Sequence, residues 1–321
     1  MEGSAPARAA APLGEAQSDR LPWAALPVAV RAGVAAALRS RVVSSADLRG
    51  GFSPGTAAAV TLADGRRAFV KAVGTPLNPD TPALYRQEVT VQGWLPRVPW
   101  TPALLATYDD GEWVALAFEH VDAPTVPVPW TRASVDAVAG VVREMHAALG
   151  PAPAEAPSVV DALGGGRGWR EWAASGVPDG APSWALHGLD RLAALEAAWP
   201  AAAEGTALLH LDLRHDNLLL SGSSVWVVDW PWAGRGAAWV DAVLLAVAVE
   251  AYGGPPAPEA FAATSPEAVG PDLLGPVLAA LSGYFVPHGL LPAPPGLPYL
   301  REVQAGQGAV VAAWLDSLGL W

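Results

Sequence analysis

Cysteine is absent from the 321-residue sequence. Its absence excludes disulfide bonds, thiolate nucleophiles and cysteine-ligated zinc. Charged residues are also scarce, because they make up 16% of the chain against roughly 25% in an average domain. Hydrophobic residues make up 52%, so the chain can bury a large core and does not have the composition of a disordered protein.

Long apolar runs and an excess of basic residues are missing as well. The longest apolar run, around Val243–Val249, lies between Asp241 and Glu250 and is far shorter than the ~18 residues that span a bilayer. The first twenty residues carry acids and lack the hydrophobic stretch of a secretory signal. The formal net charge of −12 argues against a nucleic-acid-binding protein, which shows a basic face. We therefore expect a cytoplasmic protein that binds neither nucleic acid nor membranes.

Lysine and asparagine are nearly absent, which draws attention to the positions that keep them. The chain has eighteen arginines but a single lysine, Lys71, and only two asparagines, Asn78 and Asn217. Lysine is a compact point charge, which the wide planar fork of arginine does not replace at every site. These three positions are candidates for chemistry, although chance retention explains them equally well before their neighbours are considered.

The pattern of the sequence changes near Glu119–Thr125. Before it, short apolar runs surround turn signals such as Asp64-Gly65, which predicts β-hairpins. After it, apolar residues recur at helical spacing, apart from a β patch over Leu208–Val228. We expect a disordered N-terminus at residues 1–20, a small β-rich N-lobe at residues 21–122 and a larger helical C-lobe at residues 123–321, with residues 151–170 irregular. The predicted helices are Leu21–Arg39, Thr81–Leu95, Arg132–Leu149, Ser183–Trp199, Ala237–Tyr252, Asp272–Phe285 and Pro298–Leu318.

The densest polar cluster is HLDLRHDN, at residues 210–217, which lies between apolar segments. Burying so many polar groups is costly unless they have partners, and a turn that is merely hydrogen-bonded would supply them. Asp229 follows one hairpin later, at the end of the apolar run VWVVD. Such a hairpin would hold Asn217 and Asp229 close enough to share one metal, and their oxygen atoms suit Mg²⁺.

This arrangement predicts phosphoryl transfer, in which catalysis is mostly positioning and charge neutralisation. Asp212 can orient an acceptor hydroxyl and take its proton, while Lys71 can reach the phosphates. The glycine-rich turn Gly50–Gly55 can approach phosphates without Cβ clashes.

The ordered set of motifs resembles the protein-kinase-like fold in its aminoglycoside phosphotransferase branch. HLDLRHDN matches that family's H-x-D-x-x-x-x-N motif at His210, Asp212 and Asn217. VVDW is similar to the strand of the second metal ligand, with Asp229 standing where protein kinases have the Asp of D-F-G. FVKAV resembles the third strand of the family's sheet, with Lys71 as its lysine.

The resemblance also implies roles for residues outside these motifs. Glu88, in the helix after the lysine strand, is similar to the acid that pairs with that lysine. His210 is implied to hold the catalytic loop. Asp241 falls on the second Asp of the family's G-D-P-x-x-D-L-A motif, where we expect it to bind the loop's amides. Nucleotide contacts are implied at the glycine-rich turn (Gly51, Phe52, Ser53 and Gly55) and at the hinge between the lobes (Phe118, Glu119 and Val121).

The resemblance implies an α+β, protein-kinase-like bilobal fold. It further implies that the chain moves the γ-phosphoryl group of ATP, or of GTP, to a hydroxyl of a small molecule in the presence of Mg²⁺. Leu211, Pro231 and Ala237 depart from the family's usual residues near the site. These departures leave the acceptor open among aminoglycosides, other antibiotics and metabolites, and the sequence does not indicate an oligomeric state.

Two other functions agree with parts of the sequence. A metal-dependent hydrolase could use His210, Asp212, His215, Asp216 and Asp229 as ligands, although it leaves the lone lysine and the glycine-rich turn unexplained. A catalytically inactive, nucleotide-binding regulator is the other alternative.

Aromatic and acidic residues further along are candidates for contact with an acceptor. Trp230 and Trp232 flank the site and could stack on a substrate. Charges on the late helices are expected to be solvated, although one or two of them would suit the amino groups of an acceptor: Glu250, Asp272, Glu302 and Asp316.

Overall fold

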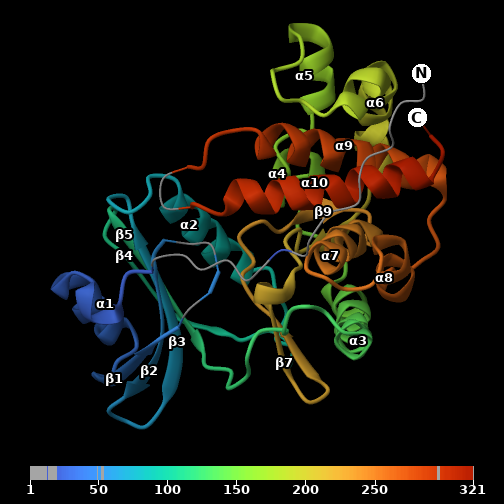
Figure 1. Ribbon diagram of the computed structural model, residues 1–321. Coiled ribbons are helices and arrows are strands. Elements are labelled where there is room, and N and C mark those ends of the chain that lie inside the picture. The colour runs from blue at the N-terminus through green and yellow to red at the C-terminus, as the bar shows by residue number, and fades with distance from the viewer. Residues whose placement is uncertain (1–12, 14–19, 49, 52–53, 295–296, 321) are drawn as a thin grey trace.

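The chain forms a β-rich part, whose last strand ends at Glu119, followed by a helical part that begins with the helix at Arg132 (Figure 1). The computed structural model describes residue 13 and residues 20–48, 50–51, 54–294 and 297–320. The predicted α+β class is confirmed, with one five-stranded sheet ahead of a mainly helical second part. The N-terminus that we expected to be disordered lies outside the described residues, apart from Leu13 and Arg20.

The sheet is antiparallel, with the strand order β1-β2-β3-β5-β4. The predicted turn between β2 and β3 is present, and Gly65 adopts φ +85° there, a conformation that glycine reaches without a steric penalty. At the turn between β4 and β5, Asp110 accepts the N–H groups of Glu112 and Trp113. The strands are β1 (Val42–Asp47), β2 (Thr56–Leu62), β3 (Arg67–Gly74), β4 (Leu104–Asp109) and β5 (Trp113–Glu119).

The first predicted helix is interrupted. A 3-10 turn over Trp23–Ala25 precedes α1 (Val28–Ala37), where one helix over Leu21–Arg39 was predicted. Pro27 explains the break, because proline disfavours the helical conformation of the residue before it.

The second helix of this part, α2 (Thr81–Gln92), forms where it was predicted. The Asn78 side-chain oxygen accepts the N–H groups of Asp80 and Thr81 and the hydroxyl of Thr81. These bonds satisfy N–H groups that the first turn of a helix leaves unpaired. Asn78, one of the two asparagines, is therefore a structural residue that caps the start of α2 from outside the helix.

The helical part contains α3 to α10, the hairpin of β7 and β8, and a second two-stranded sheet formed by β6 and β9. α3 has the predicted bounds, whereas α4, α5 and α8 were not predicted because they are short and lie beside glycine or proline. α5 depends on a distant residue, Glu196, which accepts the N–H groups of Trp169 and Arg170 at its start. The elements are α3 (Arg132–Leu149), α4 (Val159–Ala162), α5 (Gly168–Ser175), α6 (Ser183–Ala202), β6 (Ala207–Leu209), β7 (Leu218–Ser221), β8 (Ser224–Val227), β9 (Gly234–Gly236), α7 (Trp239–Ala251), α8 (Ala257–Thr264), α9 (Pro271–Gly289) and α10 (Leu300–Ser317).

The largest buried core lies among these helices. All of α7 except Glu250 is buried, which explains the apolar run that the sequence shows there. Within the part of the chain that is described, no helix has both the length and the apolar character needed to cross a bilayer. Val91 and Trp100 belong to the first part of the chain but pack into this core of the second part. The predicted domain boundary between residues 122 and 123 therefore stays a prediction.

Candidate active site

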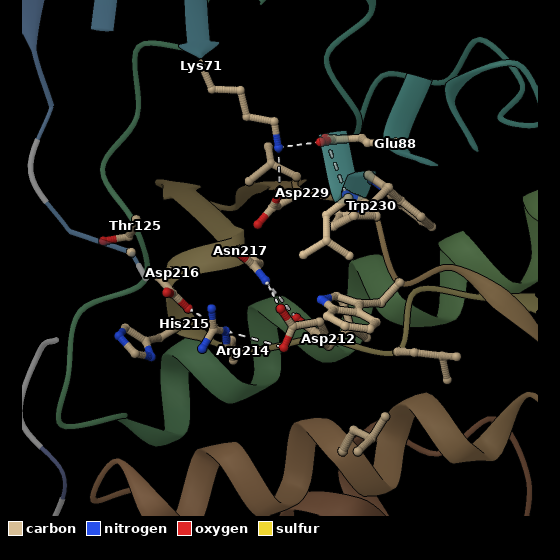
Figure 2. A pocket seen from close by; sticks show the side chains of 18 of the residues that line it. Lys71, Glu88, Thr125, Asp212, Arg214, His215, Asp216, Asn217, Asp229 and Trp230 are labelled. Carbon is tan, nitrogen blue, oxygen red and sulfur yellow. Dashed lines mark hydrogen bonds and ion pairs between the residues drawn. The ribbon is translucent and has the colours of Figure 1, made fainter. Parts of the chain in front are cut away.

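The hairpin of β7 and β8 brings Asn217 and Asp229 together. Leu218 pairs with Val227, and the N–H of Val228 donates to the carbonyl of Asn217 at 3.0 Å. Asn217 and Asp229 therefore lie at the same end of the hairpin and line one cavity of about 980 Å³ (Figure 2). The sequence predicted this pairing.

Asn217 also reaches Asp212. Its side-chain nitrogen donates to the carbonyl and to Oδ2 of Asp212, both at 2.9 Å. Asp212 thereby has a fixed orientation at the cavity wall. Because the NH₂ group of Asn217 is used in these bonds, the amide oxygen is the atom that remains for a metal.

Lys71, on β3, connects the sheet to this loop. Its Nζ forms ion pairs with Glu88 of α2 and with Oδ1 of Asp229, the latter at 2.5 Å (Figure 2). The side chains of Lys71 and Glu88 are 9% and 1% exposed, whereas that of Asp229 is 39% exposed to the cavity. The lone lysine thus lies between the two carboxylates, one of which the resemblance implied as its partner.

The charges of this triad are set by burial and by one another. Burial works against the charged form of Lys71, but Asp229 and Glu88 outweigh it and raise the pKa of Lys71. Burial raises the pKa of Glu88 against the opposing attraction of Lys71. Burial also acts to raise the pKa of Asp229, but Lys71 outweighs it and lowers that pKa. The arrangement keeps Lys71 protonated and Asp229 ionised side by side at the cavity wall.

Asp241, on α7, holds the start of the loop over residues 210–217. It is fully buried, and its two oxygens accept the N–H groups of His210 and Leu211 at 2.8 Å each. The contact that we expected between Asp241 and the loop amides is thus present.

His210 fixes the loop from the other side. Its Nε2 lies 3.0 Å from the carbonyl of Val228, and its Nδ1 accepts the N–H of Asp212. These partners require a neutral ring that carries its proton on Nε2, and burial lowers the pKa of His210 accordingly.

Two residues of the site adopt left-handed backbone conformations. Leu211 has φ +64° and Asp229 has φ +66°, which costs roughly 1–2 kcal/mol per residue that is not glycine. Leu211 is one of the positions at which the sequence departs from the usual residues of the family that it resembles. The hydrogen bond from its N–H to Asp241 helps to keep the loop in this conformation.

Arg214 was not singled out in the sequence, yet it lies beside Asp212. Its Nε is 3.4 Å from Oδ1 of Asp212 and 3.0 Å from Oδ1 of Asp216, and its side chain is 14% exposed. Burial raises the pKa of Asp212 to about 7, with Arg214 opposing and Asp216 reinforcing the shift. A carboxyl with a pKa near neutrality suits proton transfer. Only its position inside the polar cluster could have pointed to Arg214.

The residues implied to contact a nucleotide divide into three groups. Gly51 lines the cavity, as do the hinge residues Phe118, Glu119 and Val121. Phe52 and Ser53 lie outside the described residues.

Gly55, in contrast, is not among the residues that line the cavity. A Cβ at Gly55 would lie 2.2 Å from the carbonyl oxygen of Ala72, so glycine serves close packing against β3 there. Arg20, which sequence reasoning missed, lines the cavity instead, and its Nε donates to the carbonyl of Gly50 at 2.6 Å.

Of the two aromatic candidates Trp230 is placed differently from what we expected, whereas the acidic candidates lie away from the cavity, in line with the expectation of solvated charges. Trp230 is fully buried and packs against His210 with ring centroids 4.5 Å apart, so it cannot stack on a substrate. Trp232 is 41% exposed and lines the cavity. Glu250 caps α8 by accepting the N–H of Ala257. The cavity is not lined by any of the four acidic residues proposed for amino groups: Glu250, Asp272, Glu302 and Asp316.

A hydrolase-type metal cluster is not assembled by the described residues. No group of three or more histidine, aspartate or glutamate side chains among them is placed to hold a metal ion. His215 packs against Tyr252, with ring centroids 4.2 Å apart, and Asp216 pairs with Arg214. The amide oxygen of Asn217 and the carboxylate of Asp229 fit Mg²⁺ instead, because this ion keeps several waters and binds through one or two protein groups.

Comparison with known proteins agrees with this geometry. The fold is similar to that of an aminoglycoside-3'-phosphotransferase of type VIII, with 23% identity, a TM-score of 0.51, and coverage of 77% of this chain and 95% of that one. It is also similar to a choline/ethanolamine kinase family protein from Mesorhizobium loti (17% identity, TM-score 0.58, 91% and 96% covered) and to choline kinase LicA from Streptococcus pneumoniae (14%, 0.56, 87% and 97%).

These likenesses show a protein-kinase-like fold, as the resemblance implied. Comparison with curated protein sequences gives no significant match. Residues 48–281 match the family model of the phosphotransferase enzyme family, APH. Since this match covers more than half of the sequence, the chain belongs to the APH phosphotransferase enzyme family.

Proposed function

We propose that the protein is a kinase that moves the γ-phosphoryl group of ATP to a hydroxyl of a small molecule with the help of Mg²⁺. The observation that carries this proposal is the convergence of Lys71, Asn217, Asp229 and Asp212 on one cavity. Each of the four supplies a different requirement of phosphoryl transfer. A cytoplasmic location, where ATP and Mg²⁺ are abundant, is part of the proposal, and GTP is the competing donor.

The nucleotide would lie between the sheet and the catalytic loop. Its base would contact the hinge residues where β5 ends, and its phosphates would lie near Gly51 and Lys71, all of which line the cavity. Glu88 keeps Lys71 in place, because it is buried and forms an ion pair with the lysine. Lys71 would offer the phosphates a positive charge that is already oriented.

The metal would be held by Asn217 and Asp229. When bound there, Mg²⁺ would supply positive charge that offsets the charge of the phosphates. Lys71 holds the Asp229 carboxylate at 2.5 Å, and the NH₂ of Asn217 is fixed on Asp212. Both oxygen donors are therefore oriented by the protein before a metal binds.

Asp212 would act on the acceptor. In its ionised form it accepts the proton of the hydroxyl while the hydroxyl oxygen bonds to the γ-phosphorus and the bond to the ADP oxygen breaks. His210, Asn217 and Arg214 surround Asp212 and fix its orientation.

A transfer assay with the full chain tests the proposal. The protein is incubated with Mg²⁺ and ATP, or GTP, and with a panel of amino-sugar antibiotics, macrolides, nucleosides and amino alcohols. We expect one class to gain a phosphate by mass spectrometry with one ADP formed per product, and Asp212→Asn to lose this activity while it still binds ATP. Equal turnover by Asp212→Asn would contradict the assignment of the base. Nucleotide binding without transfer to any compound would favour the inactive regulator.

A further inference from the structure

The part of the cavity beyond Asp212 has mostly apolar walls. It extends toward α9 and α10, which pack side by side (Figure 1). The side chains there include Trp232, Leu281, Phe285, Leu300 and Val303. A surface of this composition binds ligands by removing apolar area from water.

Among the described residues that line the cavity, those of α9 and α10 include no carboxylate. Among the described residues, the carboxylates that line the cavity are Glu88, Glu119, Asp161, Asp212, Asp216 and Asp229. Glu88 and Asp229 pair with Lys71, and Asp212 and Asp216 pair with Arg214.

The two remaining carboxylates are placed elsewhere or already used. Glu119 belongs to the hinge and accepts the N–H of Ala103. Asp161 accepts the hydroxyl of Ser158 at 2.6 Å, at the start of α4. None of the six belongs to α9 or α10, so ammonium groups that lie against these two helices would find no carboxylate there, and an ammonium group that leaves water without such a partner is costly.

Neutral polar side chains interrupt the apolar walls, namely Tyr284, Gln304 and Gln307. The Tyr284 hydroxyl lies 3.5 Å from Nε2 of Gln304, and both residues line the cavity. Gln304 is 5% exposed, and its Oε1 accepts a hydrogen bond from Arg301 at 2.8 Å, which turns its NH₂ toward Tyr284. Burial raises the pKa of Tyr284, and the charge of Asp212 adds to the shift. The pair is thus uncharged and lies within electrostatic range of the catalytic carboxylate.

We propose that the acceptor is a neutral, largely apolar alcohol, and that Tyr284 and Gln304 position it by hydrogen bonds to an uncharged oxygen. This inference rests on the proposed kinase function and names its substrate class. The apolar body of the acceptor would lie against Trp232 and the side chains of α9 and α10. The aliphatic side chains Leu281 and Leu300 add apolar area but no ring face, whereas Trp232 offers one, so choline is the cationic competitor that the test has to include.

Equilibrium binding to the full chain tests the acceptor class. The protein is saturated with AMP-PNP and Mg²⁺ and titrated by calorimetry with a neutral macrolactone alcohol, a neutral aryl glycoside, choline and an aminoglycoside that carries four amino groups. We expect at least one neutral compound to bind tenfold or more tightly than either cation. Tighter binding of the aminoglycoside or of choline, or binding of neither neutral compound, would overturn the inference.

Matched variants test the two contacts. Tyr284→Phe removes one hydroxyl and should raise the KM of the neutral acceptor roughly 2- to 12-fold, the worth of one hydrogen bond, with a smaller change in kcat. Trp232→Ala should weaken binding roughly tenfold through lost apolar contact. Tyr299→Phe is the control, because Tyr299 is 47% exposed and does not line the cavity. Equal effects of Tyr284→Phe and Tyr299→Phe would contradict the role of Tyr284.

The same titration separates the two proposals. If AMP-PNP fails to bind in the presence of Mg²⁺, the proposed kinase function fails. If AMP-PNP binds normally and only the order of acceptor affinities differs from that given above, the acceptor class alone is wrong.

Discussion

Replacement of Lys71 by methionine should separate stability from function. The Glu88 side chain is 1% exposed and pairs with Lys71, so Lys71→Met leaves a buried carboxylate without its cation. Removing one partner of a buried ion pair costs about 3–5 kcal/mol. Asp229 adds little to this cost, because its side chain is 39% exposed and can be hydrated. We therefore expect Lys71→Met to lose about 3–5 kcal/mol of unfolding free energy, measured by urea denaturation at pH 7.

The double variant Lys71→Met/Glu88→Gln supplies the decisive comparison. It removes the buried charge while an amide oxygen remains for the N–H of Trp230, which now donates to Glu88 at 3.4 Å. We expect it to regain most of the lost stability, whereas nucleotide binding by calorimetry stays impaired in both variants. The reasoning fails if Lys71→Met is as stable as the wild type, or if the double variant is no more stable than the single one.

Three further predictions concern the catalytic loop. Arg214→Met should lower the unfolding free energy by about 2–4 kcal/mol, because Asp212 and Asp216 lose the cation between them. Adding Asp216→Asn to this variant should restore part of the lost unfolding free energy in denaturation experiments. No recovery in the double variant would contradict the pairing of Arg214 with both carboxylates. Asp241→Asn should lower the unfolding free energy by about 1–3 kcal/mol, since the single oxygen of its amide does not replace both carboxylate oxygens as acceptors for the loop N–H groups. The variant should also have a lower kcat. An unchanged kcat would show that the loop keeps its conformation without Asp241. His210 has a lowered pKa, so this residue binds its proton more readily in the unfolded chain and its own contribution to stability should fall as pH drops through 6.5, whereas Asp212, whose pKa is raised, contributes with the opposite sign. The stability of the wild type relative to His210→Gln should therefore fall between pH 7.5 and 5.5, and parallel curves for the two proteins would contradict this.

The residues that carry the proposed chemistry could be identified from the sequence because their types and order are restrictive. His210, Asp212, Asn217 and Asp229 lie in two short motifs joined by one hairpin, so local spacing alone brings them together. The single lysine stood out by rarity and does lie at the site. The rarity of asparagine wrongly suggested a chemical role for Asn78, whose side chain caps the start of α2.

The remaining features depend on contacts between distant segments. α5 begins where Glu196, more than twenty residues away, accepts its N–H groups, and no local pattern shows this. Trp230 is buried, whereas Trp232, two residues further on, is exposed and lines the cavity. The directions of these two side chains depend on the backbone that follows Asp229. Gly55 serves close packing, and Arg20 comes from a segment that precedes the recognised motifs. Motif spacing could not distinguish these roles.

Calorimetric titration of AMP-PNP into the full chain, with and without Mg²⁺, tests the central claim most directly. We expect wild-type binding to depend on Mg²⁺, Asp229→Ala to lose that dependence together with most of the affinity, and Asp212→Asn to bind as the wild type does. Wild-type affinity in Asp229→Ala, or an equal loss in Asp212→Asn, would contradict the assignment of one residue to the metal and the other to the acceptor.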